Sequence, residues 1–415
     1  MEGFVQGNCL QMCPPREISL RAEQRCLHFF ETVAFTSNSS TFSNEKNTTA
    51  DPAAMVKEFS RSAAGKCLEP SNLRPSHVLQ QTMNYLVEKI ASKDGVFTWQ
   101  KIYDFMFDRM RAIRQDLVVQ GITGKHAVDI FEKTCRFHIL SNYKLCESPP
   151  EVFDSKINND HTSECLKRLL SLYDDEHFSV YKNTRGEFEA YYLLYNLGSF
   201  DALGRALTLP EEIKENWLLQ LSIEINLTAI LKNFVRFFRL VKRLPYLACC
   251  AVHKQFNQVR VSALTSINKA YYTRNASIPF SLFVQMLNFN NIQEAKDFCT
   301  HHGLEVLDTA VKPSKGDLST SRTLHARFSN LINEKCSSTA SDLISGKGTI
   351  PPMLRGSSVH MLPTQLKGRS ASGNVTEIMN LSSVLHPVTS QPRPSWFGKM
   401  RGRGRGWGRG QKTMN

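Results

Sequence analysis

Two carboxylates, Asp108 and Asp116, stand eight residues apart in a run that also carries Arg109, Arg111 and Arg114. Paired carboxylates can act as a general acid and a general base when their surroundings push their pKa values apart. Neighbouring arginines favour the ionised form of both carboxylates, which removes that difference. We therefore predict that these five residues are structural and that their charges hold neighbouring helices together.

Thiols and an imidazole occur close together near the N-terminus, at Cys9, Cys13, Cys26 and His28. Thiolates and imidazoles are the usual zinc ligands, but this spacing differs from the paired Cys-X-X-Cys forms. A zinc site is the weaker alternative here, and half-buried thiols with a surface histidine are the prediction. Eleven scattered cysteines in a chain of 415 residues indicate reduced thiols in an intracellular compartment.

Catalytic and cofactor motifs are missing from the sequence. It contains no Walker loop, no His-Glu-X-X-His, no Gly-X-Ser-X-Gly and no dinucleotide glycine fingerprint. His301 and His302 are adjacent at the end of a predicted helix, where they balance the helix dipole rather than bind a metal. We predict a protein that is not an enzyme and that has no cofactor and no metal site.

The charged run lies on a predicted helix over residues 98–119, whose apolar residues recur at three- and four-residue steps. A second helix follows a Gly121-Ile-Thr-Gly124 break. The helices predicted are 76–91, 98–119, 125–142, 162–173, 187–196, 199–207, 217–226, 228–243 and 246–272. Paired helices joined by short turns predict a mainly α fold, an irregular helical-repeat stack of the α-solenoid type.

The pattern changes after residue 272. Two short helices, 278–289 and 292–302, precede a predicted two-stranded hairpin over 304–311. Helix–turn–helix followed by a β-ribbon is the order of a winged helix. Its second helix carries two acidic side chains against a single lysine, which is a poor face for reading DNA bases. We expect a protein-binding surface that includes Phe280, Phe283, Gln293, Lys296, His301 and Val306.

The net charge of +13 is concentrated in the C-terminal tail. Residues 312–415 hold 16 Lys plus Arg and 4 Asp plus Glu, so their net charge is +12. Subtraction from the totals of 51 and 38 leaves 35 and 34, a net charge of +1, for residues 1–311. The isoelectric point therefore does not indicate a nucleic-acid-binding surface on the folded part.

The tail has too little apolar content to offset chain entropy, so we predict disorder beyond Cys336, with a short helix over 322–335 that docks back. Its end alternates arginine with glycine around one tryptophan. Such a tract binds RNA weakly through phosphate contacts and stacking. The alternative is a solubilising or localising tail with weak, salt-sensitive affinity. The residues of the possible RNA contact are Arg401, Arg403, Arg405, Trp407 and Arg409.

The longest apolar run, 244–252, is far shorter than the ~20 residues that a membrane helix needs. The first residues lack the basic start and the apolar stretch of a signal peptide. We expect a soluble intracellular protein without membrane contact.

Four ordered motifs resemble the Sac-three/GANP family of helical scaffold proteins. They are Met12-Cys-Pro14, Asp108-Arg-Met-Arg-Ala-Ile-Arg-Gln-Asp-Leu117, Glu189-Ala-Tyr-Tyr-Leu-Leu-Tyr-Asn-Leu-Gly198 and Phe238-Arg-Leu-Val-Lys-Arg-Leu-Pro-Tyr246. The resemblance covers about residues 8–312. It implies a PCI-like fold, in which a helical-repeat stack ends in a winged helix.

The resemblance also implies partners and a cellular role. Large members scaffold a nuclear-pore mRNA-export complex, in which the winged helix pairs with that of a second PCI protein holding a small acidic subunit. Small members are associated with centrosome duplication and spindle progression. Segments 56–66 and 73–75 resemble the small members most closely.

We therefore expect a non-enzymatic scaffold acting at the centrosome and spindle in cell division, located in the cytoplasm. The alternative is an RNA-contacting scaffold of mRNA export, located in the nucleus. The domains expected are an N-terminal segment and linker (1–50), a helical-repeat domain (51–272), a winged helix (273–312) and a basic tail (313–415).

Overall fold

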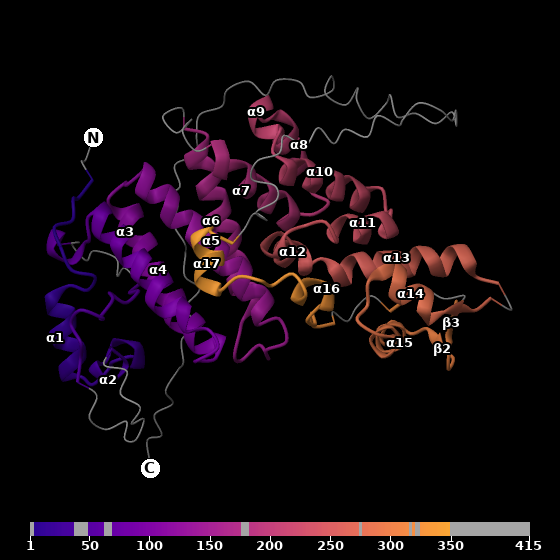
Figure 1. Cartoon of the computed structure of the whole chain (residues 1–415), viewed down its shortest axis with the longest axis horizontal. Coiled ribbons are helices and arrows are strands. Elements are labelled where there is room, and N and C mark those ends of the chain that lie inside the picture. The colour runs from indigo at the N-terminus through magenta and orange to yellow at the C-terminus, as the bar shows by residue number, and fades with distance from the viewer. Residues whose placement is uncertain are drawn as a thin grey trace, which may run out of the picture. The chain divides into compact units, whose positions relative to one another are not determined.

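A computed structural model of the chain describes residues 4–36, 49–61, 69–175, 182–273, 276–314, 318–319 and 324–348. The chain divides into two units, Met1–Gly356 and Ser357–Asn415, and every residue of the second lies outside the described ranges. The described part is mainly helical (Figure 1). The mainly α prediction is confirmed.

The N-terminal region lies along one side of the helical stack, and its described residues form short helices only (Figure 1). Its elements are α1 (Pro15–Glu23), a 3-10 turn (Phe29–Glu31), α2 (Val33–Thr36) and a second 3-10 turn (Pro70–Asn72). Proline at the first position of α1 suits a helix start, because the missing N–H would have no helical partner there.

The first half of the stack is built from long helices. They are α3 (Ser76–Tyr85), which continues through a π turn (Leu86–Ile90) and a 3-10 turn (Ala91–Lys93), α4 (Trp99–Val119), α5 (Lys125–Lys144), α6 (Ser155–Tyr173) and α7 (Lys182–Tyr195). Glycines end α4 and begin α5, since Gly121 and Gly124 both have positive φ angles of 59° and 95°.

The second half of the stack uses shorter helices. They are α8 (Phe200–Thr208), α9 (Glu211–Lys214), α10 (Trp217–Ile230), α11 (Phe234–Val241), α12 (Tyr246–His253) and α13 (Phe256–Tyr271). The helices predicted over 162–173 and 187–196 begin earlier than expected, at Ser155 and Lys182. Two helices predicted in the second half were also wrong in their bounds. The helix predicted over 228–243 breaks at Lys232, whose φ is 54°, and restarts where the side chain of Asn233 caps α11. The helix predicted over 246–272 is two helices, which meet at 254–255.

Helix α5 is at the centre of the packing and contacts α3, α6, α12 and α17 (Ala340–Ser345). Its polar side chains are buried as well as its apolar ones, and they have partners. The Arg136 guanidinium donates two hydrogen bonds to Glu187 at 2.9 and 2.8 Å, and His138 shares a 2.8 Å hydrogen bond with Asn158. Paired in this way, buried charges are tolerated in a helical core.

The stack is followed by a C-terminal module, residues 278–312, which contains two helices and a small sheet (Figure 1). Its elements are β1 (Ile278–Pro279), α14 (Phe280–Leu287), α15 (Ile292–His301), β2 (Glu305–Val306) and β3 (Ala310–Lys312). The sheet is antiparallel in the order β1-β3-β2, with Ile278 opposite Val311 and Glu305 opposite Lys312. The predicted two-stranded hairpin thus has a third strand, β1. The assignment of this module as a winged helix stays a prediction.

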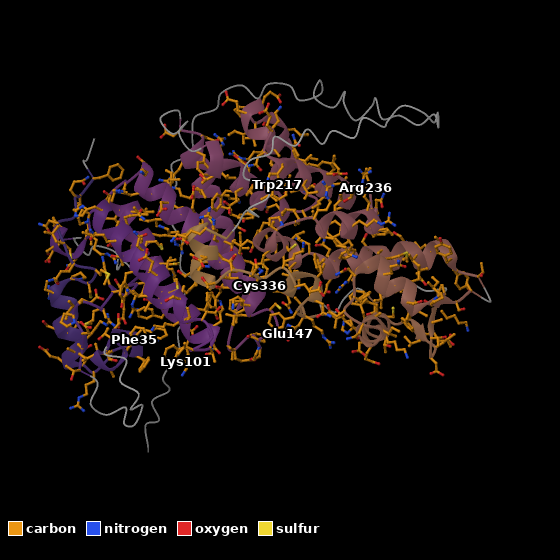
Figure 2. All side chains as sticks on the ribbon, viewed as in Figure 1. Phe35, Lys101, Glu147, Trp217, Arg236 and Cys336 are labelled. Carbon is orange, nitrogen blue, oxygen red and sulfur yellow. The ribbon has the colours of Figure 1, made fainter. Side chains whose placement is uncertain are left out.

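Beyond the C-terminal module the chain returns to the stack. Residues 324–329 are extended, α16 (Asn330–Asn333) follows, and α17 (Ala340–Ser345) packs on α5 with Leu343 and Ile344 buried. Glu147, labelled in Figure 2, accepts a hydrogen bond from the backbone N–H of Phe328 at 2.9 Å. The expected disorder beyond Cys336 is therefore wrong for α17, and the predicted helix over 322–335 is limited to α16. The remainder of the tail lies outside the described residues.

Candidate functional site

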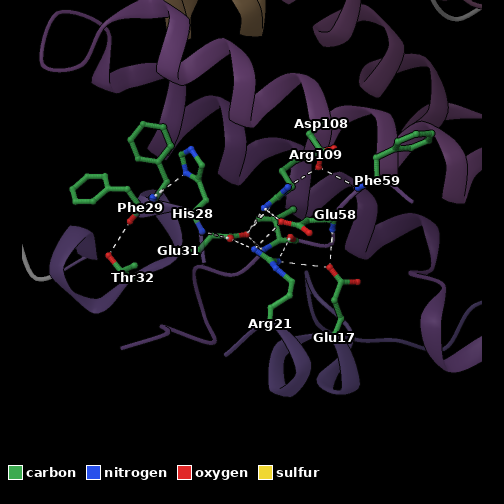
Figure 3. Close-up of polar contacts among 12 residues, drawn as sticks. Glu17, Arg21, His28, Phe29, Glu31, Thr32, Glu58, Phe59, Asp108 and Arg109 are labelled. Atoms are coloured by element: carbon green, nitrogen blue, oxygen red, sulfur yellow. Dashed lines mark hydrogen bonds and ion pairs between the residues drawn. The ribbon is translucent and has the colours of Figure 1, made fainter. Parts of the chain in front are cut away.

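A cluster of buried charges joins α4 to the N-terminal region (Figure 3). At its centre is Glu31, whose side chain is fully buried. Glu31 forms ion pairs with Arg21 of α1 and with Arg109 of α4, the latter at 3.1 Å. Its carboxylate also accepts a hydrogen bond from the backbone N–H of Val56 at 3.1 Å. One carboxylate thus holds three segments that are far apart in the sequence.

The outer part of this cluster fixes the segment that follows residue 56. Arg109 lies 2.9 Å from Glu58, and Asp108 accepts a hydrogen bond from the backbone N–H of Phe59 at 3.1 Å (Figure 3). The Arg111 guanidinium stacks over the ring of Phe59, 3.8 Å from its centroid. Three neighbouring charged residues of α4 therefore anchor the same non-helical segment, which contains Glu58 and Phe59.

A second buried charge cluster surrounds Asp116, about two helical turns beyond Arg109 on α4. Asp116 is fully buried and lies 2.8 Å from the Nε atom of Arg74 and 2.6 Å from the Nζ atom of Lys57. Arg74 is itself fully buried and donates a 3.1 Å hydrogen bond to the carbonyl of Met12. The backbone N–H of Lys57 bonds the same carbonyl at 3.1 Å. Asp116 thereby positions the Met12-Cys-Pro motif indirectly.

Arg114 differs from the other four charged residues predicted to be structural (the signature residues Asp108, Arg109, Arg111 and Asp116), because it contacts a helix of the stack. It donates to the Sγ atom of Cys165 on α6 at 3.0 Å and lies 3.7 Å from Glu164. The prediction that the signature charges hold neighbouring helices describes Arg114. The other four instead hold the non-helical N-terminal segments against α4. Glu31 and Arg74, their principal partners, were missed, although Arg74 stands in a motif that carried the family resemblance.

Burial shifts several pKa values in this region. It raises the pKa of Glu17, despite the neighbouring Arg21. It lowers the pKa of His28 to about 4, and Arg109 adds to that shift. Burial opposes the charge of Arg109, but Glu31, Asp108 and Glu58 together raise its pKa above the ordinary value. Arg109 is therefore held in its charged form, and its ion pairs with Glu31 and Glu58 are a structural clamp between α4 and the N-terminal segments.

The four residues considered for zinc do not converge in a metal site. Cys9 and Cys13 are buried, Cys26 is exposed, and His28 accepts a hydrogen bond from the backbone of Phe30 at 3.2 Å. Among the described residues, no group of three or more His, Cys, Asp or Glu side chains is arranged to hold a metal ion. Within the same residues, no helix is long and apolar enough to cross a bilayer.

The six residues predicted to bind a partner occupy two environments in the C-terminal module. Phe280 and Phe283 are fully buried in its core, so the structure corrects their assignment to an exposed surface. An aromatic pair one turn apart on a short helix fits a core as well as an interface, and here the core takes both. Gln293 is exposed, while Lys296, His301 and Val306 are partly buried. The possible RNA contacts, Arg401, Arg403, Arg405, Trp407 and Arg409, lie outside the described residues.

Other apolar side chains of the C-terminal module do face solvent. Leu282 of α14, Ile292 of α15 and Leu307 after β2 are 41%, 48% and 42% exposed. Strand β2 is an edge of the small sheet, with β3 on one side only. Unpaired strand edges and exposed aliphatic side chains are the usual means by which such a module binds another protein.

A stack of helices clamped to its N-terminal segment by buried ion pairs, and followed by a two-helix module, defines a helical scaffold. The sequence matches the SAC3/GANP family over residues 12–308, and the chain belongs to that family.

Individual relatives agree with this assignment. Over 318 residues the chain is 31% identical to protein xmas of Drosophila melanogaster, covering 74% of this chain and 15% of the relative. It is 29% identical to SAC3 family protein 1 of Schizosaccharomyces pombe, over 73% of this chain and 30% of that relative. Protein THP3 of Saccharomyces cerevisiae is 24% identical, over 62% of this chain and 51% of that relative. The chain thus spans less than a third of the first two relatives.

Proposed function

We propose that this protein is a non-enzymatic scaffold of nuclear mRNA export that contacts RNA. The observation that carries the proposal is the family match over residues 12–308, together with the similarity to protein xmas and protein THP3. The helical stack supplies the rigid body of the scaffold, and the C-terminal module supplies an exposed surface for a partner.

The partner in this proposal is a second PCI protein, which holds a small acidic subunit. The exposed aliphatic residues Leu282, Ile292 and Leu307 and the edge strand β2 support this choice, because an obligate protein interface buries apolar area at its centre. RNA is contacted by the Arg-Gly tract at the end of the chain, through phosphate groups and stacking on Trp407.

The role at the centrosome and spindle was our first expectation from the sequence. The relatives above favour the export role, so the centrosomal role stays a prediction that the same experiment addresses. In either role the protein works through contacts and not through catalysis.

The test is affinity purification of the full chain from cells, with recovery of bound RNA and identification of bound proteins. A Gln variant, with Arg→Gln at positions 401, 403, 405 and 409, removes four positive charges from the tail. A Lys variant, with Arg→Lys at the same positions, retains them. RNA recovery from the Gln variant should fall at least tenfold, and the Lys variant should remain close to the parent. Binding should also weaken steeply between 50 and 200 mM salt, because displaced counterions drive it.

Recovery of a PCI protein with all three chains would support the proposal. Recovery of centrosomal or spindle proteins without RNA, equally from all three, would overturn it in favour of the mitotic role.

A further inference from the structure

A cleft of about 720 Å³ lies where the helical stack meets the C-terminal module. Its walls come from the ends of α5 and α12, the first turns of α6 and α13, the end of α15, and the extended residues 324–326. This volume is within the range of ~300–1,000 Å³ that small-molecule sites occupy. None of the functions considered above uses this cleft.

The polar lining of the cleft includes the start of α13. Lys254, Asn257 and Gln258 line it, and the last two lie in the first turn of this 16-residue helix. The N-cap residue, Gln255, makes no side-chain hydrogen bond to the helix start. The backbone N–H groups of a first helical turn carry partial positive charge and favour an anion.

His302 provides an independent indication of a ligand. The residue lines the cleft and is only 2% exposed. Its Nδ1 atom lies 2.7 Å from the carbonyl of Ser319, which requires a proton on Nδ1. Its Nε2 atom is buried and has no hydrogen-bond partner within the described part of the chain. A buried polar atom without a partner destabilises the fold, and a bound ligand that satisfies it removes this penalty.

The charge of the cleft has one sign. None of the described residues that line it is a carboxylate, and Lys254 is the one cationic side chain among them. Three histidines, His253, His302 and His325, also line it, and burial lowers the pKa of His253 to about 4. Burial lowers the pKa of Lys254 to about 8, and its Nζ atom lies 3.1 Å from the ring centroid of Tyr195. Burial is the cause of that shift, and no carboxylate among the described residues offsets it. An anion beside it would provide the missing partner.

We propose that this cleft binds a phosphate-bearing ligand of nucleotide size. The phosphate lies at the first turn of α13 beside Lys254, and the polar edge of the base or sugar bonds to His302 and the amide side chains. Amide side chains present both donors and acceptors, and the unpaired Nε2 atom of His302 adds a further polar contact. This set suits the edge of a base better than a second anionic group. The ligand is a free nucleotide or one nucleotide unit of an RNA chain.

The experiment measures binding to the full chain by isothermal titration calorimetry. The probes are inorganic phosphate, the four nucleoside monophosphates, and RNA tetranucleotides with and without a terminal phosphate. Lys254→Met should weaken binding of every phosphate-bearing probe at least tenfold. His302→Leu should weaken binding of the nucleotides but not of inorganic phosphate, because His302 bonds the base or sugar.

The matched control is Lys269→Met, which removes an exposed lysine from the last turn of the same helix, outside the cleft. It should bind like the parent chain. Circular dichroism melting identifies any variant that fails to fold. If a variant fails to fold, Gln258→Ala is tested in its place. Gln258 lies on the exposed rim of the cleft, and its substitution should weaken nucleotide binding about threefold.

The outcomes separate the two sources of the ligand. Equal affinity for mononucleotides and tetranucleotides supports a free nucleotide, and at least tenfold tighter binding of the tetranucleotides supports an RNA unit. Absence of binding by all probes at millimolar concentration overturns the proposal, as does equal loss from Lys254→Met and Lys269→Met. The tail variants described above do not alter the cleft, so failure here is distinguishable from failure of the export proposal.

Discussion

Different forces stabilise two regions of the molecule: the contact between α4 and the N-terminal segments, and the interior of the C-terminal module. Where α4 meets these segments, Glu31 of the N-terminal region and Asp116 of α4 are fully buried, and each is paired with two cations. The C-terminal module has an apolar core with Phe280 and Phe283 at its centre. The first region depends on charges that cannot be removed singly, and the second on contact area that tolerates changes at its surface.

This difference separates a structural role from a binding role. The charged signature of α4 is directed inward and determines where the N-terminal segments lie. The C-terminal module directs aliphatic side chains outward, and these are available to a partner. The predictions below test this division by substitution in each region.

The largest effect is expected for Asp116→Ala. Removal of this carboxylate leaves the buried Arg74 and the half-buried Lys57 without their shared partner. Breaking a buried ion pair costs about 3–5 kcal/mol, since the remaining charge stays desolvated. Urea unfolding should show a loss of this size in the free energy of unfolding.

The control for that variant is Glu211→Ala. Glu211 lies 2.6 Å from Lys214, but its side chain is 83% exposed. An exposed pair contributes about 0–1 kcal/mol. If both variants lost the same small amount of stability, the clamp would not hold the fold.

A smaller effect is expected on acidification, and it concerns His253 between the stack and residues 324–329. Burial lowers the pKa of His253 to about 4 from its ordinary value of 6.5, so the unfolded chain binds a proton more readily than the folded chain. The stability contributed by the neutral ring is complete above pH 6.5 and declines as the pH falls towards 4. The full loss is about 3 kcal/mol.

Urea unfolding between pH 7 and pH 4 measures this loss. His253→Gln should make the profile shallower by the contribution of this one residue. His28 and His138, whose pKa values burial lowers to about 4 and about 3, act in the same direction and should leave part of the slope in place. A profile that His253→Gln does not change would contradict the assignment.

Arg111→Ala should have a lesser effect than either of these. The guanidinium of Arg111 contacts the Phe59 ring at the edge of the first charge cluster and is partly exposed. Cation–π contacts at exposed sites contribute about 0.5–1 kcal/mol. Thermal melting should therefore show a small fall in Tm, and Arg111→Leu, which keeps apolar contact with the ring, should recover part of it.

The fold of α4 and α5 was predictable because their apolar residues repeat with a helical period and glycines separate the two helices. The break at 254–255 was not, since Lys254 and Gln255 carry no helix-breaking signal. The ion pair between Glu31 and Arg109 joins residues 78 positions apart. Local pattern carries no information on such a pair, so the charged residues of α4 were found but the direction of their contacts was not.

The smallest effect on stability is expected in the C-terminal module, where Ile292→Asp and Leu307→Asp replace side chains that are 48% and 42% exposed. Because these residues contribute little to the core, each variant should unfold within about 0.5 kcal/mol of the parent. Binding of the partner should nevertheless fall at least tenfold in co-purification, since a charge at the centre of an apolar interface is desolvated without compensation. Phe283→Asp is the contrasting change, because it places a charge in the core and should unfold the module. Retention of the partner by both surface variants would show that the partner binds elsewhere on the scaffold.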